Sequence, residues 1–201
     1  IPMILVNGTK GIGTGFSTDI MCYNPLQIIS YIQNKLENNE NSDLIEPYYE
    51  GFKGQIIKIN STKYLIKGVY SIQTNTVHIT ELPIDVWTDD YKQYLETLID
   101  IKAKKSVKGD EKKKVDKKSL IKDYDDLSTD TNVDIKIIFH SGVIQELTNK
   151  QIDENTNELE KLLKLYTTKT TTNMHLFDAN EKLQKYKNIE NIIDDYFVCR
   201  L

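Results

Sequence analysis

The chain has 201 residues, of which 39% are hydrophobic and 28% are charged, and its formal net charge at pH 7 is -4. This composition is ordinary for a soluble globular protein and does not look fibrous. The net charge also disfavours a protein that coats nucleic acid with its whole surface, although a local basic face stays open. Arg200 is the only arginine. DNA binding by this chain would therefore rely on lysines, hydroxyls and backbone amides, which position a duplex better than they read its sequence.

The apolar runs are far shorter than the ~20 residues of a membrane helix, and the N-terminus lacks the pattern of a signal peptide. We therefore expect no membrane partner and a cytosolic or nuclear location. Cys22 and Cys199 have no partner spacing, so we expect reduced thiols and no metal site. Because Ile1 is not an initiator methionine and a helix-like run continues to Leu201, we expect an excised piece of a larger protein.

The first quarter of the chain predicts a strand, a glycine-rich loop and a helix. The apolar run IPMILV at 1–6 is strand-like. A helix is predicted within NPLQIISYIQNKLENN, residues 24–39, with Asn24 as N-cap and Pro25 at the first helical position.

The next segments predict strands and then a second helix. GQIIKI, KYLIKGVYSI and TVHITEL, at 54–59, 63–72 and 76–82, have β-like composition and suggest an antiparallel meander. WTDDYKQYLETLIDI, residues 87–101, predicts a helix with Thr88 as N-cap.

Residues 102–130 are dominated by lysine, aspartate and serine, which is typical of a mobile, solvated insertion. A basic arm near DNA is the alternative. Beyond it we expect a strand, a helix, a hairpin around Asn180 and a terminal amphipathic helix, at 133–140, 158–166, 173–186 and 188–201. The elements together predict an α+β fold, a mainly antiparallel sheet with flanking helices.

The stretch NGTKGIGTGFST, residues 7–18, places Ile12 among four glycines. A dinucleotide fingerprint fails because its third glycine would fall at Phe16, and a P-loop fails because Lys10 precedes the glycine cluster. Two interpretations remain open. The loop is a structural turn with Ile12 in a core, or Ile12 is an apolar wedge for DNA that the glycines let the backbone approach.

Several motifs in a fixed order resemble one family, the type II DNA topoisomerases, in their eukaryotic single-chain form. They are IPMILVNGTKGIGTGFST, YNPLQII, PYYEGFKG at 47–54, ITELPIDVWTDDYKQYL at 79–95, KLYTTKTTTNMHLFDANEKLQKY at 164–186 and IIDDYFVCRL at the end. The resemblance covers nearly the whole chain apart from the lysine-rich insertion. It implies a DNA-bending loop at 1–23 and the tower domain at 24–201, with the terminal helix leading to a coiled-coil arm.

The resemblance also implies which residues meet double-stranded DNA. Ile12 matches the isoleucine that intercalates and bends the gate duplex. The residues expected to bind DNA around it and in the second segment are Lys10, Gly11, Gly13, Thr14, Ser17, Thr18, Lys164, Leu165, Tyr166, Thr167, Thr168, Lys169, Thr170, Thr171, Thr172 and Asn173. A threonine-rich strand is the alternative for 164–173. Lys53 is a further candidate, with turn structure as its alternative.

The same resemblance places the catalytic tyrosine, its neighbouring arginine and the sites for Mg²⁺ and ATP in parts of the enzyme that precede this chain. We therefore expect no catalytic residue and no metal ligand here, and dimerisation of the parent through other regions. The parent would act in the nucleus or, for a viral enzyme, at a cytoplasmic replication site. A stand-alone DNA-bending module without catalysis is the alternative, and a protein-interaction domain that never touches DNA is a further one.

Overall fold

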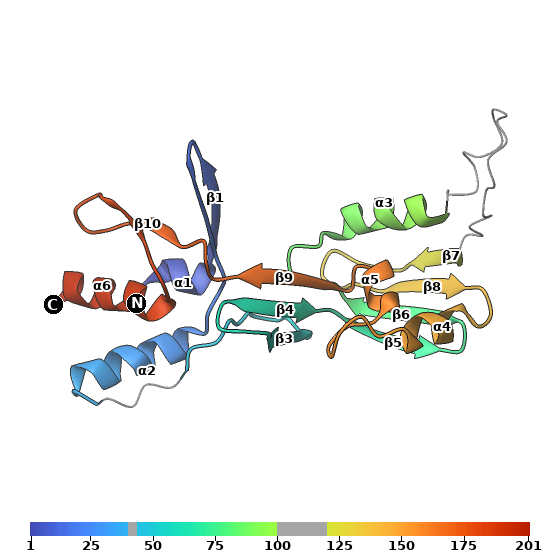
Figure 1. Ribbon diagram of the computed structural model, residues 1–201, viewed down its shortest axis with the longest axis horizontal. Helices are drawn as coiled ribbons and strands as arrows, with labels where there is room; N and C mark the ends of the chain where they lie inside the picture. Colours follow the sequence, from blue (N-terminus) through green and yellow to red (C-terminus); the bar gives the residue numbers. More distant parts are fainter. Residues whose placement is uncertain (40–43, 100–119) are drawn as a thin grey trace. The chain divides into compact units, whose positions relative to one another are not determined.

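The computed structural model describes residues 1–39, 44–99 and 120–201 (Figure 1). The chain forms two compact units. Unit 1 comprises Ile1–Phe52, Ile56–Tyr64 and Lys169–Leu201, and unit 2 comprises Lys53–Gln55 and Leu65–Thr168. This division follows the packing of the chain, whereas the expected boundary between residues 23 and 24 separates functional regions and stays a prediction.

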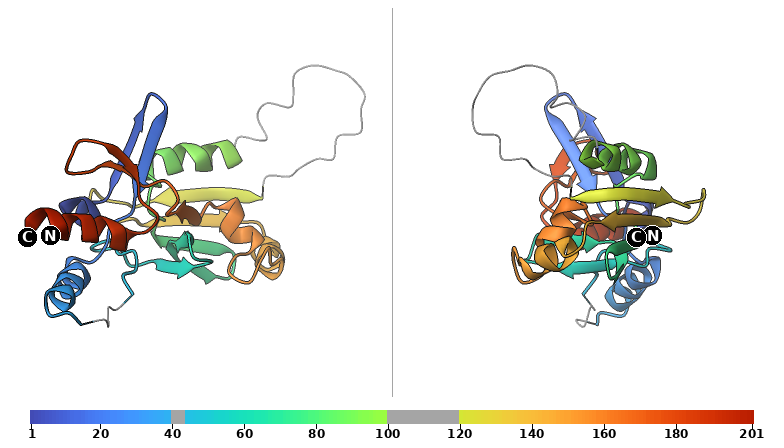
Figure 2. Two further views of the ribbon diagram at one scale, coloured as in Figure 1. Left: turned by 60° about the vertical axis from the view of Figure 1, so that its left-hand side comes forward. Right: turned by 90° about the vertical axis from the view of Figure 1, so that its right-hand side faces the viewer.

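In the part of unit 1 that the structure describes, the chain forms two antiparallel hairpins and three helices (Figure 2). Its elements are α1 (Met3–Asn7), β1 (Thr9–Gly13), β2 (Phe16–Ile20), α2 (Pro25–Leu36), β10 (His175–Phe177), β11 (Leu183–Lys185) and α6 (Ile189–Arg200). The cap predicted for α2 is confirmed: the Asn24 side chain accepts a 2.9 Å hydrogen bond from the backbone N–H of Leu26, and Pro25 opens the helix. The predicted hairpin around Asn180 and the terminal helix are also confirmed.

Buried apolar side chains from the helices and their connections form the core of unit 1. Its members are Leu5, Ile20, Met21, Tyr23, Ile28, Ile45, Tyr64, Met174, Tyr186, Ile189, Ile192 and Ile193. The β1–β2 hairpin, which is described in full, contributes Ile20 alone to this cluster. The rest of the hairpin projects away from the helices of unit 1 (Figure 1).

The strand predicted for residues 1–6 is wrong, because Met3–Asn7 form the short helix α1. The backbone N–H of Leu5 donates to the Pro2 carbonyl at 3.1 Å, and Leu5 is fully buried in the core. A run of four apolar residues carries no periodicity that separates a buried strand from a buried helical turn. Tertiary packing of Leu5 therefore decides the conformation.

Unit 2 is built on a four-stranded antiparallel sheet in the order β5-β6-β8-β7. Its elements are β5 (Val69–Gln73), β6 (Thr76–Glu81), α3 (Thr88–Ile99), β7 (Ile121–Asp126), β8 (Ile135–Phe139), α4 (Val143–Asn149) and α5 (Glu158–Leu162). Two tyrosines of α3 fix the helix to the end of α5: the hydroxyl of Tyr91 donates to the Leu163 carbonyl at 2.7 Å, and that of Tyr94 to the Leu162 carbonyl at 2.6 Å. The mixture of helices and antiparallel sheet agrees with the predicted fold class.

The meander predicted for residues 54–82 is only partly right. β3 (Gln55–Lys58), β4 (Lys63–Lys67) and β9 (Tyr166–Thr170) form a separate three-stranded sheet in the order β3-β4-β9, while β5 pairs with β6. The chain leaves one sheet for the other at Gly68, where an added Cβ would lie 2.2 Å from the carbonyl oxygen of Glu81. Only glycine allows so close an approach of two backbones.

The prediction of a mobile insertion at residues 102–130 is wrong for part of its described residues. Residues 100–119 lie outside the described residues, but Ile121–Asp126 form β7 at the edge of the sheet. An edge strand with one buried side chain, here Ile121, carries little apolar signal in its sequence. The helix predicted for 158–166 ends at Leu162, because Lys164 adopts a left-handed backbone (φ 49°) before β9 begins.

Candidate nucleic-acid interface

The glycine-rich stretch folds as the β1–β2 hairpin with Thr14 and Gly15 at its turn. The ladder pairs Lys10 with Asp19, Gly11 with Thr18, Ile12 with Ser17, and Gly13 with Phe16. Gly15 has φ 86°, a conformation that glycine adopts without steric cost. Because paired residues share a face, Ile12 and Ser17 lie on one side of the hairpin, and the two glycines, Thr18 and Phe16 lie on the other.

Ile12 is 89% exposed, so the interpretation that places it in a core is wrong. An isoleucine left in water forgoes roughly 1.5–3 kcal/mol that burial would contribute. Unstacking of one base step costs a few kcal/mol, which is the same order. Insertion of Ile12 between bases would therefore offset a large part of the cost of opening that step.

Gly11 and Gly13 are not required by the packing of the chain. Neither has a positive φ, and an added Cβ would meet its nearest atom, Thr18 Cγ2 or the Phe16 carbonyl oxygen, at an ordinary 3.7 Å. Alanine would fit at both positions in the isolated chain. The packing of the chain alone therefore gives no reason for glycine on either side of Ile12.

Strand β2 of the hairpin is held by residues 169–175, all within unit 1. The backbone N–H of Asp19 donates to the Asn173 carbonyl at 2.9 Å, and Asn173 Nδ2 lies 2.8 Å from Ser17 Oγ. His175 Nδ1 lies 3.1 Å from the Ser17 carbonyl oxygen, and Lys169 Nζ lies 3.2 Å from Asp19 Oδ1. These contacts bring part of the second predicted segment to the glycine-rich loop.

The members of the second predicted segment have different environments. Leu165 is fully buried in the core of unit 2, and Lys164 Nζ lies 3.7 Å from the centre of the Tyr94 ring, a cation–π contact. The hydroxyl of Thr167 donates to the Ile84 carbonyl at 3.2 Å, and that of Thr171 to the Thr62 carbonyl at 3.5 Å. The exposed side chains among the predicted residues of this segment are those of Lys164, Thr168, Thr170 and Thr172, while Tyr166 is half-buried.

Residues 166–170 form the strand β9, as the threonine-rich alternative predicts. A strand is compatible with DNA contact on its open face, since hydroxyls suit phosphate oxygens. In this arrangement the side chain of Leu165 packs in the core, and that of Thr167 makes a backbone hydrogen bond.

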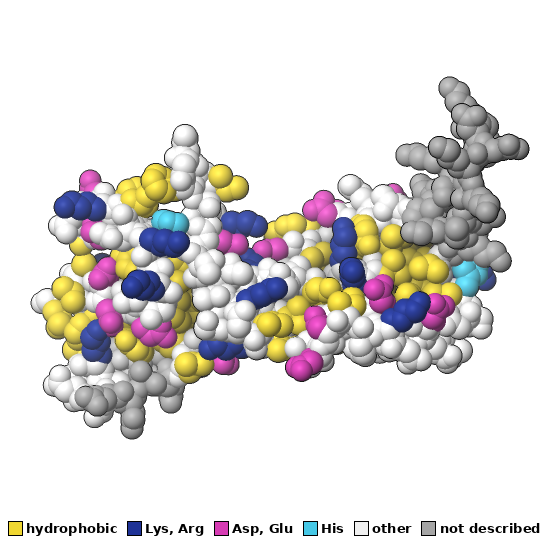
Figure 3. Space-filling model, in the orientation of Figure 1, with side chains coloured by type: hydrophobic (Ala, Val, Ile, Leu, Met, Phe, Trp, Pro, Cys, Tyr) yellow, Lys and Arg dark blue, Asp and Glu magenta, His cyan; other side chains and the backbone are white. Residues whose placement is uncertain are grey.

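Lys10, Gly11, Gly13, Thr14 and Ser17 are all exposed, and Thr18 is half-buried. Figure 3 shows the hairpin as a mostly white projection, since backbone and hydroxyl side chains make up most of its surface. Lysines and acidic side chains are interspersed over the same view, so this face is not uniformly basic.

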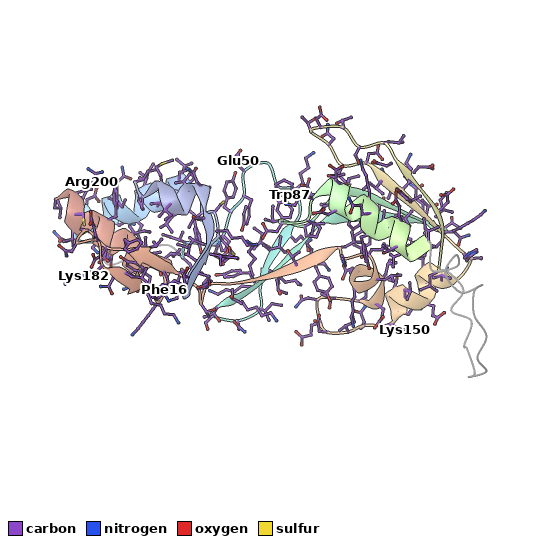
Figure 4. The ribbon with its side chains drawn as sticks, turned by 90° about the horizontal axis from the view of Figure 1, so that it is seen from above. Phe16, Glu50, Trp87, Lys150, Lys182 and Arg200 are labelled. Atoms are coloured by element: carbon purple, nitrogen blue, oxygen red, sulfur yellow. The ribbon has the colours of Figure 1, made fainter. Side chains whose placement is uncertain are left out.

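Three residues at the hairpin, Phe16, His175 and Asp19, were not predicted as site residues from the sequence. Phe16, labelled in Figure 4, is 56% exposed and its ring centre lies 6.2 Å from that of His175. His175 and Asp19 take part in the contacts that hold β2. The hydrophobic and polar patterns of β2 and β10 do not reveal that these two strands meet, because the contact joins residues more than 150 positions apart.

Among the described residues, no three or more His, Cys, Asp or Glu side chains are grouped as a metal site would require. The ranges that the structure describes also contain no helix long and apolar enough to cross a membrane. Cys22 and Cys199 are free thiols.

Comparison with known proteins identifies the class of this chain. The family model for the DNA gyrase/topoisomerase IV A subunit matches residues 1–201. The chain therefore belongs to this family, and the resemblance based on its motifs is confirmed.

Individual relatives and a solved structure agree. The chain is 36% identical to the mitochondrial DNA topoisomerase 2 of Dictyostelium discoideum, over all of this chain and 14% of that protein. It is 33% identical to DNA topoisomerase 2 of Acanthamoeba polyphaga mimivirus, over all of this chain and 19% of that protein. The crystal structure of the Plasmodium falciparum topoisomerase II DNA-binding, cleavage and re-ligation domain matches with a TM-score of 0.83 and 39% identity, covering all of this chain and 24% of that one. The chain thus spans less than a quarter of these proteins.

Proposed function

We propose that this chain is the part of an ATP-dependent type II DNA topoisomerase that binds and bends the gate duplex. The parent enzyme would break both strands of one duplex transiently, pass a second duplex through the break and reseal the first. The observation that supports this role for the chain is the exposure of Ile12 on a glycine-lined hairpin. Ile12 enters the minor groove and opens a base step, and the resulting kink lets the duplex contact more of the protein.

Phosphate contacts around the wedge hold the duplex in register. Lys10, Thr14, Ser17 and Thr18 contact the backbone beside Ile12, with Gly11 and Gly13 allowing close approach. From the second segment, the exposed hydroxyls of Thr168, Thr170 and Thr172 and the ammonium of Lys164 reach phosphates. None of these groups reads a base edge, so this region sets the position and bend of the duplex.

Mg²⁺ and ATP belong to other parts of the proposed enzyme. The glycine-rich stretch forms a hairpin that presents an isoleucine, unlike a phosphate-binding loop. No catalytic step is assigned to this chain. The parent would act as a homodimer assembled through other regions, in the nucleus or at a viral replication site.

A test uses the complete parent protein and interlinked DNA circles. The proposed ATP-dependent type II enzyme unlinks intact circles only with ATP and Mg²⁺, and Ile12→Ala lowers DNA cleavage and unlinking while the protein stays folded. A protein that bends DNA without ever unlinking circles would be an architectural module instead. A protein that shows no salt-dependent duplex binding would contradict any role in DNA binding.

A further inference from the structure

We propose that Asn173, His175 and Lys169 form a clasp that fixes the direction of the hairpin, so that they act on DNA through Ile12. This clasp, defined by these three residues with Ser17 and Asp19, rests on the proposed wedge function of Ile12. It gives Asn173 and Lys169 a positioning role in place of the direct DNA contact expected from their sequence segment.

A clasp is needed because a two-stranded hairpin alone is marginally stable in water. Of the ten residues in β1 and β2, only Ile20 enters the core of unit 1. The contacts at Ser17 and Asp19, together with the ring contact between Phe16 and His175, therefore tie β2 to the body of unit 1. Ser17 is the residue directly opposite Ile12, so the clasp holds the hairpin at the level of the wedge.

The hydrogen-bonding roles in the clasp follow from its chemistry. The Ser17 carbonyl can only accept, so His175 Nδ1, 3.1 Å away, carries the proton. The Asn173 side-chain oxygen then faces Nδ1, at 3.2 Å, and its amide nitrogen donates to Ser17 Oγ at 2.8 Å. Because Ser17 Oγ accepts from Asn173, its own proton is directed elsewhere and is available to a phosphate oxygen.

Lys169 completes the clasp by pairing with Asp19. Its side chain is only 10% exposed, and Nζ lies 3.2 Å from Asp19 Oδ1. A lysine in this setting is poorly placed to release counterions from DNA, unlike the exposed Lys10 on the hairpin itself. The two lysines therefore provide a matched pair for separating positioning from direct phosphate contact.

The first experiment measures the salt dependence of duplex binding by the full parent enzyme. Loss of one phosphate contact reduces the slope of log affinity against log salt by about 0.9. Lys10→Met is expected to show that reduction, and Lys169→Met is expected to keep the wild-type slope while lowering the fraction of bent DNA. A reduced slope in Lys169→Met would overturn the clasp, because it would make Lys169 a phosphate ligand.

The second experiment measures bending by energy transfer across a doubly labelled duplex. Asn173→Ala and His175→Ala are each expected to lower the ratio of bent to unbent duplex at least about fivefold, the effect of losing one ordinary hydrogen bond. His175→Asn is expected to restore bending, because its amide nitrogen can donate where Nδ1 did. Asn132→Ala, in an exposed turn of unit 2, is the control expected to bend DNA normally.

The outcomes separate this inference from the proposed function. Normal bending by the His175→Ala enzyme, or no rescue by His175→Asn, would overturn the clasp. If Asn173→Ala fails to fold, the His175 pair decides the matter. Normal bending by Ile12→Ala would instead contradict the wedge itself.

Discussion

Ile12 lies directly opposite Ser17 in the β1–β2 ladder, so the most exposed apolar side chain of the hairpin shares a face with the residue that Asn173 and His175 hold. An exposed isoleucine on a mobile loop would sample many directions. Anchoring its cross-strand partner restricts that motion before DNA arrives. The proposed wedge is therefore preorganised, which lowers the ordering cost of binding.

Two glycines of the N-terminal region should respond to substitution in opposite ways. Gly8→Ala is expected to destabilise the fold by about 1–3 kcal/mol, since its φ is 65° and an added Cβ would lie 2.8 Å from the Ile20 carbonyl oxygen. Gly11→Ala is expected to leave stability nearly unchanged but to weaken duplex binding and bending. Urea unfolding and duplex titration of both variants check this. A large loss of stability in Gly11→Ala would show that the glycine serves the fold.

Removing the acidic partner of the buried ion pair in unit 2 should strongly destabilise that unit. Glu160 accepts from Lys67 Nζ at 2.5 Å and from the Tyr70 hydroxyl at 3.1 Å, and its side chain is almost fully buried. Glu160→Ala leaves Lys67 without its charged partner and is expected to cost about 3–5 kcal/mol. The shift of the urea midpoint measures this cost.

Glu146, which pairs with Lys150 on the exposed surface of α4, provides the control for Glu160. Glu146→Ala is expected to change the midpoint little, because exposed ion pairs are screened by water and salt. Equal shifts for the Glu146 and Glu160 variants would contradict the account of the buried pair.

The Tyr70 hydroxyl should ionise at a higher pH than that of an ordinary tyrosine. Burial, together with the nearby charge of Glu160, raises the pKa of Tyr70 to about 12. Because the folded-state pKa lies above the unfolded value of about 10, the stabilisation is complete below pH 10 and is lost as the pH rises towards 12. Absorbance titration of wild type against Tyr70→Phe measures the difference. If the difference between the two titration curves shows a tyrosine that ionises near pH 10, the predicted environment of Tyr70 would be contradicted.

The turn of the β10–β11 hairpin should loosen in acid. Hydrogen bonds, chiefly from the backbone N–H of Lys182, lower the pKa of the Asp178 carboxyl. A lowered folded-state pKa means that this stabilisation is present above the usual value of about 3.9 and is lost as the pH falls through the lowered one. The amide NMR shifts of Asn180 and Lys182 report it. Asp178→Asn, which does not titrate, should abolish the transition, and a midpoint above the usual value would contradict the account.

Local sequence signals predicted the elements whose determinants are local. The Asn24 cap with Pro25 defined α2, and alternation defined β8, because capping and pleating depend on neighbouring residues. The helix at Met3–Asn7 and the strand at Ile121–Asp126 depend on the residues that pack against them. The sequence therefore predicted a strand in place of the helix and no regular element in place of the strand. Tertiary context outweighed propensity in both.

The candidate site was predictable to a similar extent. The glycine spacing excluded nucleotide-binding loops. It did not decide whether Ile12 is a buried core residue or a wedge for DNA, and only the structure shows that Ile12 is exposed. The clasp was not predictable, because Asn173 and His175 meet Ser17 only through long-range folding. Motif similarity had grouped Lys169 and Asn173 with the DNA contacts, and the geometry separates them from the exposed threonines.

The most direct test of the central claim compares Ile12→Ala with Ile72→Ala in the complete enzyme bound to a doubly labelled gate duplex. Ile72 is a matched control, an exposed isoleucine on the edge strand β5 of unit 2. Energy transfer should show that Ile12→Ala loses most of the bend while Ile72→Ala and wild type bend the duplex equally. Full bending by a well-folded Ile12→Ala enzyme would contradict the wedge.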